Sequence, residues 1–282
     1  MTDVLPRIAV VARRRRRLPS TLIGAFVVLG ASLVLAFFPA LFAPYDPTAF
    51  DYGAIMHAPS ALHPFGTDNF GRDVLSRVIH AYRIDMQIAV FATIGPFIAG
   101  TIIGAVVGYV GGWAEALFGR VVDAVITFPL LVLVIAIVSV LGPGLGNMYV
   151  AWGVIGWVFY ARLIAAEIKI QRRLDYADAA RAMGYTHGRI IFRHLLPNAI
   201  TPAIVYWMTD MALAILLGSS LGYLGLGAQP PAAEWGVLIT DGKNFMSTAW
   251  WITVFPGIAI VLTGLGFSLA GDGLAELLRV NR

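Results

Sequence analysis

The chain has 282 residues, of which 59% are hydrophobic and only 13% are charged. Soluble globular proteins carry about 25% charged residues, so this composition excludes a soluble domain and predicts an integral membrane protein. The net charge of +4 does not indicate nucleic-acid binding, because five of the arginines are concentrated in Arg13 to Arg17 and the others are scattered around apolar segments. The absence of cysteine excludes a disulfide framework and a thiolate metal site.

A short basic arm, residues 1–20, precedes an uncharged run at 21–43. At about 1.5 Å per residue this run is long enough to cross about 30 Å of hydrocarbon. It exceeds the apolar core of about 7 to 15 residues in a cleaved signal peptide, so we predict a retained span. Further apolar runs predict an all-α protein with six transmembrane helices, the other five lying at about 86–110, 121–141, 149–166, 199–222 and 251–271.

Lysine and arginine are distributed unevenly among the segments that separate these spans, and positively charged segments stay in the cytoplasm. With the N-terminus inside, 16 of these residues fall on the inner side and 4 on the outer side. We therefore predict that both termini, the segment 167–198 and the tail 276–282 are cytoplasmic, and that the loop 44–85 is extracytoplasmic. The outer four residues are Arg72, Arg77, Arg83 and Lys243.

The predicted outer loop contains the only histidines and acids that suggest a metal site. His57, His63 and Asp68 are the candidate ligands. Their irregular spacing on a loop is typical of solvated surface side chains, so we predict no metal site.

Glycines recur at every fourth position of the second predicted span: Gly100, Gly104, Gly108 and Gly112. Small residues at this spacing form a flat stripe that lets helix backbones approach closely, which favours helix packing inside a membrane. The sequence leaves open whether the stripe packs on a helix of the same chain or on a second subunit.

Asp210 is the one ionisable residue near the middle of a predicted span. An aspartate there costs roughly 2.5 to 3.5 kcal/mol on insertion scales, so we expect it to face protein or a water-filled path. Asp210 could line a translocation path together with Tyr206 and Trp207. It could equally be a hydrogen-bonded packing residue near Tyr206 and Thr209.

The most polar stretch within the apolar part of the chain is DYADAARAMGYTHGRIIFRHLLPN, residues 175–198. Good helix formers run over 175–183, with acidic residues in the first turn, where they complement a helix N-terminus. Gly184 interrupts this helix, and Thr186 is a suitable N-cap for a second short helix that Pro197 closes. We therefore expect two short amphipathic helices joined at a glycine.

This stretch resembles the EAA loop of ATP-binding-cassette (ABC) importer permeases, whose pattern is Glu-Ala-Ala, three residues, Gly, nine residues and Ile-x-Leu-Pro. Here Asp178-Ala179-Ala180 precedes three residues, Gly184, nine residues and His194-Leu195-Leu196-Pro197. Aspartate keeps the charge of the glutamate, and histidine before Leu-Leu-Pro-Asn resembles the dipeptide and oligopeptide branch. The resemblance extends over nearly the whole chain from residue 63, through HPFGTDNFGRDVLSR at 63–77, LGYLGLGAQPPAAEWG at 221–236, FPGIAI at 255–260 and GDGL at 271–274.

The resemblance implies the type I importer permease fold and a non-catalytic C-type subunit of a dipeptide or oligopeptide importer in the cytoplasmic membrane. The implied partners are a homologous second permease, one or two P-loop ATPase subunits that hold ATP and Mg, and an extracytoplasmic substrate-binding protein. Residues 175–198 would form the coupling helices that contact the ATPase. The residues assigned to this contact are Asp178, Ala179, Ala180, Arg181, Met183, Gly184, Arg189, His194, Leu196 and Pro197.

Other chemistries lack the residues that they need. No GxxxxGK[S/T] motif is present, so we expect this chain to bind neither ATP nor another cofactor itself. GSSLG at 218–222 fits the nucleophile-elbow pattern, but that elbow requires a strand-turn-helix context that an apolar span does not provide. Two alternatives remain open: a permease of the same family for nickel or another small solute, and an ATP-independent secondary transporter.

Overall fold

The structure, a computed structural model, describes residues 18–279. Most of the predicted basic arm 1–20 and the last three residues of the predicted tail 276–282 lie outside the described residues. Within residues 18–279 the chain is helical and contains no strand, apart from one isolated bridge between Thr67 and Asp73. The predicted all-α class is confirmed.

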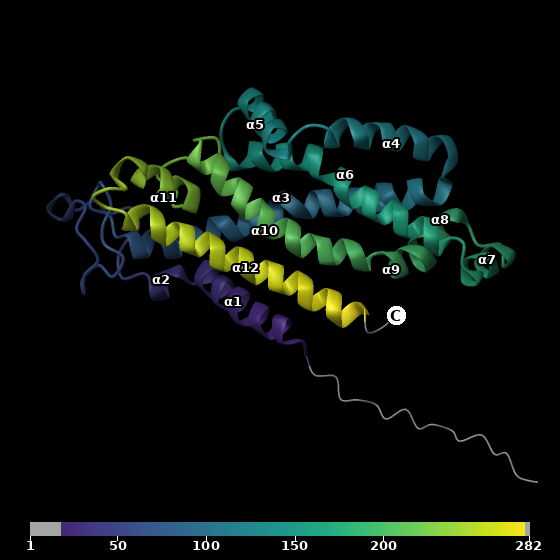
Figure 1. Cartoon of the computed structure of the whole chain (residues 1–282), viewed down its shortest axis with the longest axis horizontal. Coiled ribbons are helices and arrows are strands. Elements are labelled where there is room, and N and C mark those ends of the chain that lie inside the picture. Colours follow the sequence, from purple (N-terminus) through teal and green to yellow (C-terminus); the bar gives the residue numbers. More distant parts are fainter. Residues whose placement is uncertain (1–17, 280–282) are drawn as a thin grey trace, which may run out of the picture.

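Five long helices run side by side along the molecule (Figure 1), and each is long and apolar enough to cross a membrane. They are α1 (Ser20–Phe37), α3 (Val74–Val110), α6 (Leu145–Gln171), α10 (Thr201–Tyr223) and α12 (Trp251–Arg279). A sixth span is formed only if α4 (Gly112–Ile126) and α5 (Leu130–Leu141) are counted together, because they meet at a bend of 84°.

The single span expected over 121–141 is therefore broken. Helix α4 ends at Ile126, and α5 begins after Pro129. Proline disfavours the helical conformation of the residue before it, so the helix stops before Phe128 and restarts in a new direction. Hydropathy alone did not reveal this bend, since the residues on both sides of Pro129 are apolar.

Helix α3 begins twelve residues before the span expected at 86–110, inside the segment expected as the loop 44–85. Asp73 caps it by accepting a hydrogen bond from the Ser76 amide at 2.7 Å. Its 37 residues extend for about 55 Å at 1.5 Å per residue, which exceeds the hydrocarbon layer. The polar first turns of α3 therefore extend beyond the apolar layer, and hydropathy placed the start of the helix too late.

The glycine stripe of α3 packs against α6 of the same chain. A Cβ atom added at Gly100 or Gly104 would lie 2.4 Å from a backbone oxygen of α6, and at Gly108 the distance would be 2.6 Å. The partner that the sequence left open is therefore α6. Gly112 does not belong to this stripe, because it begins α4 with φ +60° and has no neighbour within 4 Å of an added Cβ.

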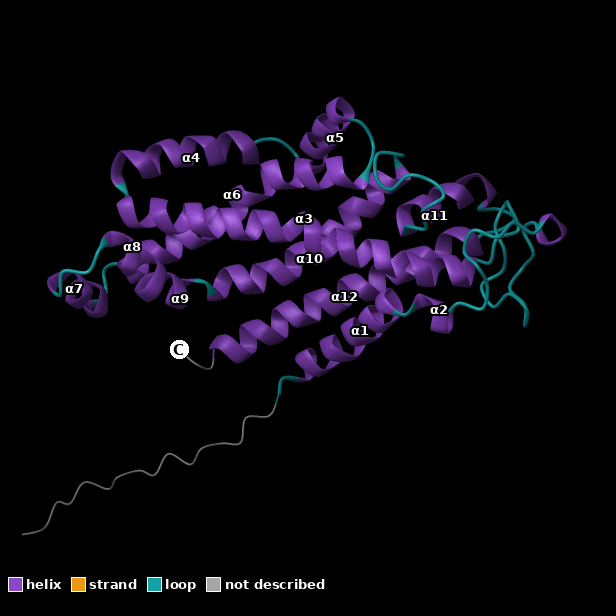
Figure 2. Ribbon diagram, turned by 180° about the vertical axis from the view of Figure 1, so that it is seen from behind, coloured by secondary structure: helices purple, strands orange, loops and turns teal. Residues whose placement is uncertain are grey.

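The bundle has two different ends. One carries the loop 44–73, with α2 (Pro39–Phe42) and η1 (Tyr52–Ala54), next to α11 (Trp235–Gly242) and η3 (Lys243–Phe245); we call it the loop end. The other carries the short helices between α6 and α10, as the view from behind also shows (Figure 2). The start of α1 and the end of α12 both point toward this second end (Figure 1).

Candidate functional sites: the 175–198 segment and the buried polar groups

The segment 175–198 begins with α7 (Asp175–Ala182), which has Asp175 and Asp178 in its first turn. Gly184 follows with φ +73°, a left-handed conformation that glycine adopts without steric cost. The Thr186 hydroxyl accepts a hydrogen bond from the Arg189 amide at 3.4 Å and caps the next helix. The local structure thus contains the glycine bend and the threonine cap that the residue order predicts.

The second helix does not end at Pro197. Helix α8 (His187–Arg189), the π-helical turn η2 (Ile190–Leu195) and α9 (Leu196–Ala199) follow one another and lead into α10. The Leu196 amide donates to the carbonyl of Ile191, five residues earlier, just before the proline. Because Pro197 lies in the first turn of α9, where its missing N–H costs little, it is accommodated within the helical run.

Apolar side chains hold the segment against the bundle. Ala177 and Ala180 of α7 are buried together with Ile190, Ile191 and Leu195, against α6. Ala180 is only 2% exposed. Its side chain therefore cannot supply the surface contact that the sequence assigned to it, and we correct its role to anchoring α7.

Polar contacts add a second connection between the segment and the long helices. Arg172 Nη1 donates to the Tyr109 carbonyl at 2.6 Å, and the Tyr109 hydroxyl lies 2.9 Å from His187 Nδ1. Arg181 bridges α7 to the end of α6 by donating to the Arg172 carbonyl at 2.6 Å, and it also pairs with Asp178.

Most of the residues assigned to the ATPase contact lie on the surface of this segment. His194 and Leu196 are half-buried, and His194 stacks on Tyr185 with ring centroids 5.4 Å apart. The guanidinium carbon of Arg189 lies over the same Tyr185 ring, 4.0 Å from its centroid. The exposed members are Asp178, Ala179, Arg181, Met183, Gly184, Arg189 and Pro197.

Asp210 is buried between α6 and α10. It is 5% exposed and accepts a hydrogen bond from the Tyr160 hydroxyl of α6 at 2.6 Å. Tyr206 packs edge-on against the same tyrosine ring, with centroids 5.0 Å apart. Trp207 donates to Thr93 Oγ1 at 2.8 Å. Of the two roles that the sequence left open for Asp210, this geometry favours packing between α6 and α10.

Asp210 is not the only acid buried among the helices. Asp85 in α3 and Glu234 before α11 are both 0% exposed. Asp85 accepts from the Trp235 amide at 3.2 Å, and Glu234 accepts from the Gly236 and Val237 amides at 2.7 and 3.0 Å. Burial raises the pKa of Glu234 above its ordinary value. Glutamate just before an apolar helix start is a recognisable cap, but no local pattern marks Asp85.

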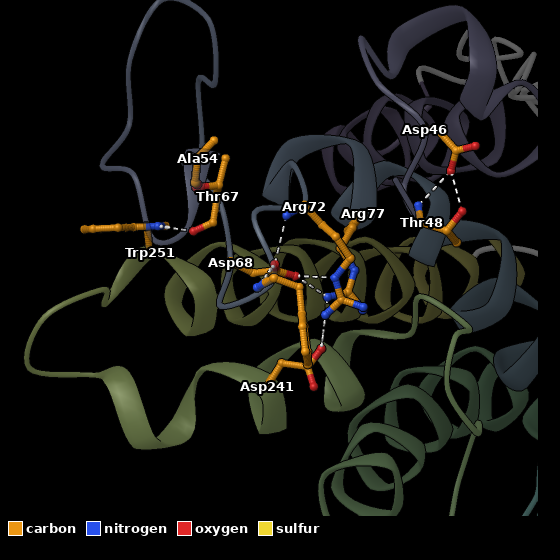
Figure 3. A network of polar contacts seen from close by, with 10 residues as sticks. Asp46, Thr48, Ala54, Thr67, Asp68, Arg72, Arg77, Asp241 and Trp251 are labelled. Atoms are coloured by element: carbon orange, nitrogen blue, oxygen red, sulfur yellow. Dashed lines mark hydrogen bonds and ion pairs between the residues drawn. The ribbon is translucent and has the colours of Figure 1, made fainter. Parts of the chain in front are cut away.

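Four charged side chains at the loop end form a cluster, shown in Figure 3. Asp68 accepts from Arg72 Nε at 2.7 Å and from Arg77 Nη1 at 2.6 Å. Asp241 of α11 accepts from the same two guanidinium groups at 2.9 Å. We call Asp68, Arg72, Arg77 and Asp241 the charge cluster; it joins the loop 44–73 and α3 to α11.

Two of the three candidate metal ligands of the loop are engaged elsewhere. Asp68 belongs to the charge cluster, and His63 Nδ1 lies 2.9 Å from Asp73 Oδ1. No group of three or more potential ligands comes together among residues 18–279.

The fold is that of the membrane subunits of type I ABC importers. A solved structure described as inward-facing conformations of the MetNI methionine ABC transporter matches with a TM-score of 0.59 and 17% sequence identity. The match covers 73% of this chain and 96% of the other. Residues 100–279 match the family described as binding-protein-dependent transport system inner membrane component, and the chain belongs to this family.

Relatives with known names are similar over nearly the whole chain. Dipeptide transport system permease protein DppC of Alkalihalophilus pseudofirmus is 38% identical, over 91% of this chain and 84% of the relative. The probable D,D-dipeptide transport system permease protein DdpC of Escherichia coli is 38% identical, over 92% and 87%. Glutathione transport system permease protein GsiD of Pectobacterium atrosepticum is 36% identical, over 90% and 84%. The resemblance seen in the sequence is confirmed, and all three relatives are named as transport system permease proteins.

Proposed function

We propose that this chain is the non-hydrolytic C-type permease subunit of an ABC importer that carries short peptides across the cytoplasmic membrane. The names of its relatives, which concern dipeptides, D,D-dipeptides and glutathione, support the peptide substrate. Nickel or another small solute of the same family is the second candidate. An ATP-independent secondary transporter is disfavoured, because the chain belongs to a family of binding-protein-dependent transport systems.

The observation that carries the proposal is the 175–198 segment. It is an exposed, charged pair of short helices at one end of an apolar bundle, and its bend is fixed by the left-handed Gly184. Such a segment provides an exposed surface for a separate ATPase subunit to bind. The buried side chains of Ala180, Ile190 and Leu195 transmit the motion of the segment to the bundle. Nucleotide-driven closure of two ATPase subunits would then alternate the permease pair between inward-open and outward-open states.

The proposed orientation puts this segment and both termini in the cytoplasm. The excess of lysine and arginine in these segments supports this side. The start of α1 and the end of α12 share their side with α7, as expected for an even number of spans. The loop end would then face the extracytoplasmic binding protein, and the proposed complex adds a homologous second permease and one or two P-loop ATPases with ATP and Mg.

Substitution of Gly184 by valine tests the coupling role. Valine at φ +73° is strained, whereas the space around Gly184 is open, so the substitution changes the bend rather than the packing. We expect the reconstituted importer to keep hydrolysing ATP while peptide uptake falls at least about tenfold. Gly188→Val is the matched control, because it is also open to solvent but does not have a positive φ.

Uptake measurements distinguish the coupling role of residues 175–198 from the assignment of the protein as an ATP-driven peptide importer. Uptake of a labelled dipeptide into proteoliposomes, with and without ATP, tests the transport class and the substrate. Normal uptake by the Gly184→Val variant would contradict the role of the bend and leave the importer assignment intact. Uptake that follows an ion gradient and needs no ATP would contradict the importer assignment itself.

A further inference from the structure

A groove of about 370 Å³ lies between α1 and α3, toward the loop end of the bundle. Helix α1 contributes Leu33 and Phe37 to its wall, and α3 contributes Val90 and Phe91. These four side chains are between 40% and 74% exposed, so they form an apolar surface that nothing in residues 18–279 covers. In a bilayer, such a surface lies against lipid or against another apolar segment.

One positively charged side chain lies at this apolar groove. Arg83 of α3 lines it and is exposed. Within the described part of the chain, Arg83 makes no hydrogen bond, ion pair or aromatic contact. The other two arginines of the loop end, Arg72 and Arg77, are both paired with Asp68 and Asp241. Arg83 therefore offers five N–H donors that residues 18–279 leave unused.

The depth of Arg83 follows from the length of the helix that carries it. From Arg83 to Val110, α3 advances 27 residues, or about 40 Å at 1.5 Å per residue. A hydrocarbon layer is about 30 Å thick, and the headgroup regions bring the bilayer to about 40 to 45 Å. With the far end of α3 at the opposite surface, Arg83 lies at the level of the lipid headgroups.

The polarity of the groove changes along α3 in one direction. Arg83 is outermost, the amide of Gln87 follows one turn deeper, and Val90 and Phe91 follow in the next turn. On the facing helix, Leu33 lies one turn deeper than Phe37, the last residue of α1. A phospholipid shows a matching order when read inward: the charged phosphate comes first, the polar ester groups follow, and the hydrocarbon chains come last.

We propose that this groove binds a membrane phospholipid, whose phosphate accepts hydrogen bonds from Arg83 and whose acyl chain lies along Leu33, Val90 and Phe91. A guanidinium group matches the geometry of phosphate oxygens and binds them through paired hydrogen bonds. Gln87 is placed to contact the ester region. An anionic headgroup is preferred, because Arg83 is a lone positive charge. This inference goes beyond the proposed function and depends only on the bundle lying in a bilayer.

A lipid fits the groove better than a helix of another subunit does. A helix with its side chains is about 10 to 12 Å across, so it would cover the mouth of the groove without filling it. An acyl chain is narrow enough to lie along the floor between α1 and α3. A phosphate is also the most abundant acceptor at the depth of Arg83, whereas a protein partner would have to supply a matching carboxylate.

Native mass spectrometry of the purified importer, stripped of lipid and titrated with phosphatidylglycerol, tests the proposal. We expect Arg83→Gln to weaken binding of the tightest lipid about tenfold or more, as the loss of charged hydrogen bonds implies. Arg83→Lys keeps the charge and should retain part of the affinity, and Leu33→Trp should weaken binding by filling the groove. Lys243→Gln, which removes an exposed cation at the same end, is the matched control and should change the affinity less than twofold.

Phosphatidylethanolamine and inorganic phosphate complete the titration. Weaker binding of phosphatidylethanolamine supports the preference for an anionic headgroup, and failure of inorganic phosphate to compete supports the contribution of the acyl chain. Equal lipid affinity of the wild type and Arg83→Gln would overturn the proposal. Cross-linking of position 83 to a second subunit in an importer that retains no lipid would overturn it as well. None of these readouts requires transport, so the result is independent of the peptide assignment.

Discussion

Arginine–aspartate pairs occur at both ends of the bundle, but they are buried at the loop end and exposed at the other. In the charge cluster, the side chains of Arg77 and Asp68 are 3% and 1% exposed. In α7, the side chains of Arg181 and Asp178 are 40% and 67% exposed. The buried arginine–aspartate pairs therefore hold elements of the fold together, whereas the exposed pair presents charge at the surface.

The two regions also differ in what they join. The charge cluster connects residues far apart in the sequence, since Arg72 and Asp241 are separated by 169 positions. Trp251 at the start of α12 adds another connection by donating to the Thr67 carbonyl at 3.0 Å (Figure 3). The Arg181 pair spans three residues of one helix. The loop end thus behaves as a fixed frame, and the 175–198 segment as an attachment whose outer face remains available to a partner.

The largest expected effect comes from Arg77→Met. Without Arg77, Asp68 and Asp241 share the single guanidinium group of Arg72, so the buried cluster carries one negative charge in excess. Breaking a buried ion pair in this way typically costs about 3 to 5 kcal/mol. We expect a loss of this size in the free energy of unfolding, measured by titration with a denaturing detergent. A loss below about 1 kcal/mol would show that the charge cluster does not hold the loop end together.

Gly104→Ala tests whether α3 and α6 form one rigid unit between the two regions. The added methyl group would meet the Ala161 carbonyl of α6, and overpacking of this kind costs about 1 to 3 kcal/mol. Gly95→Ala in the same helix is the control, because no atom lies within 4 Å of an added Cβ there. That control should be neutral or stabilising by up to about 1 kcal/mol. Equal effects at the two positions would exclude close α3–α6 packing as the cause.

Tyr160→Phe tests whether Asp210 holds helices together, as the charge cluster does, or lines the translocation path. The substitution leaves the buried carboxyl without its hydrogen-bond donor, which costs about 1 to 3 kcal/mol of stability. If Asp210 is a packing residue, peptide uptake per folded importer should stay within about twofold of the wild type. Unchanged stability together with a large loss of uptake would instead assign Asp210 to the translocation path.

The smallest effect on stability is expected for Arg181→Met. Exposed ion pairs contribute about 0.2 to 1 kcal/mol, so the free energy of unfolding should barely change. Co-purification of the ATPase subunits with this chain measures their association. It should fall in the Arg181→Met variant if the outer face of α7 is the contact. Stability losses of equal size in Arg181→Met and Arg77→Met would remove the distinction between the two regions.

The sequence predicted much of the fold because hydropathy responds to a single requirement. A segment that crosses hydrocarbon must be apolar over about 20 residues, and its backbone groups must be paired within a helix. This requirement located α1, α6, α10 and α12. It failed where the helix continues beyond the apolar layer, as in residues 74–85 of α3, and where two apolar helices meet at a bend, as at Pro129.

The local structure of the 175–198 segment could also be predicted from the sequence, because it depends on neighbouring residues. Gly184 adopts its positive φ, and Thr186 caps its helix, through interactions within a few residues. The burial of Ala180 could not be predicted, since it depends on which face of α7 lies against Ile190, Ile191 and Leu195. A pattern of residue types names the segment but does not say which of its side chains stay exposed.

By itself, the sequence determined the membrane class, the approximate spans, the bend at Gly184 and the family resemblance, since each rests on composition or on neighbours along the chain. Only the tertiary structure decided that the glycine stripe packs on α6, that Asp210 is bound to Tyr160 and that Arg77 reaches Asp241. These contacts join residues about 50 to 170 positions apart, and no local pattern specifies which distant atoms will meet when helices pack.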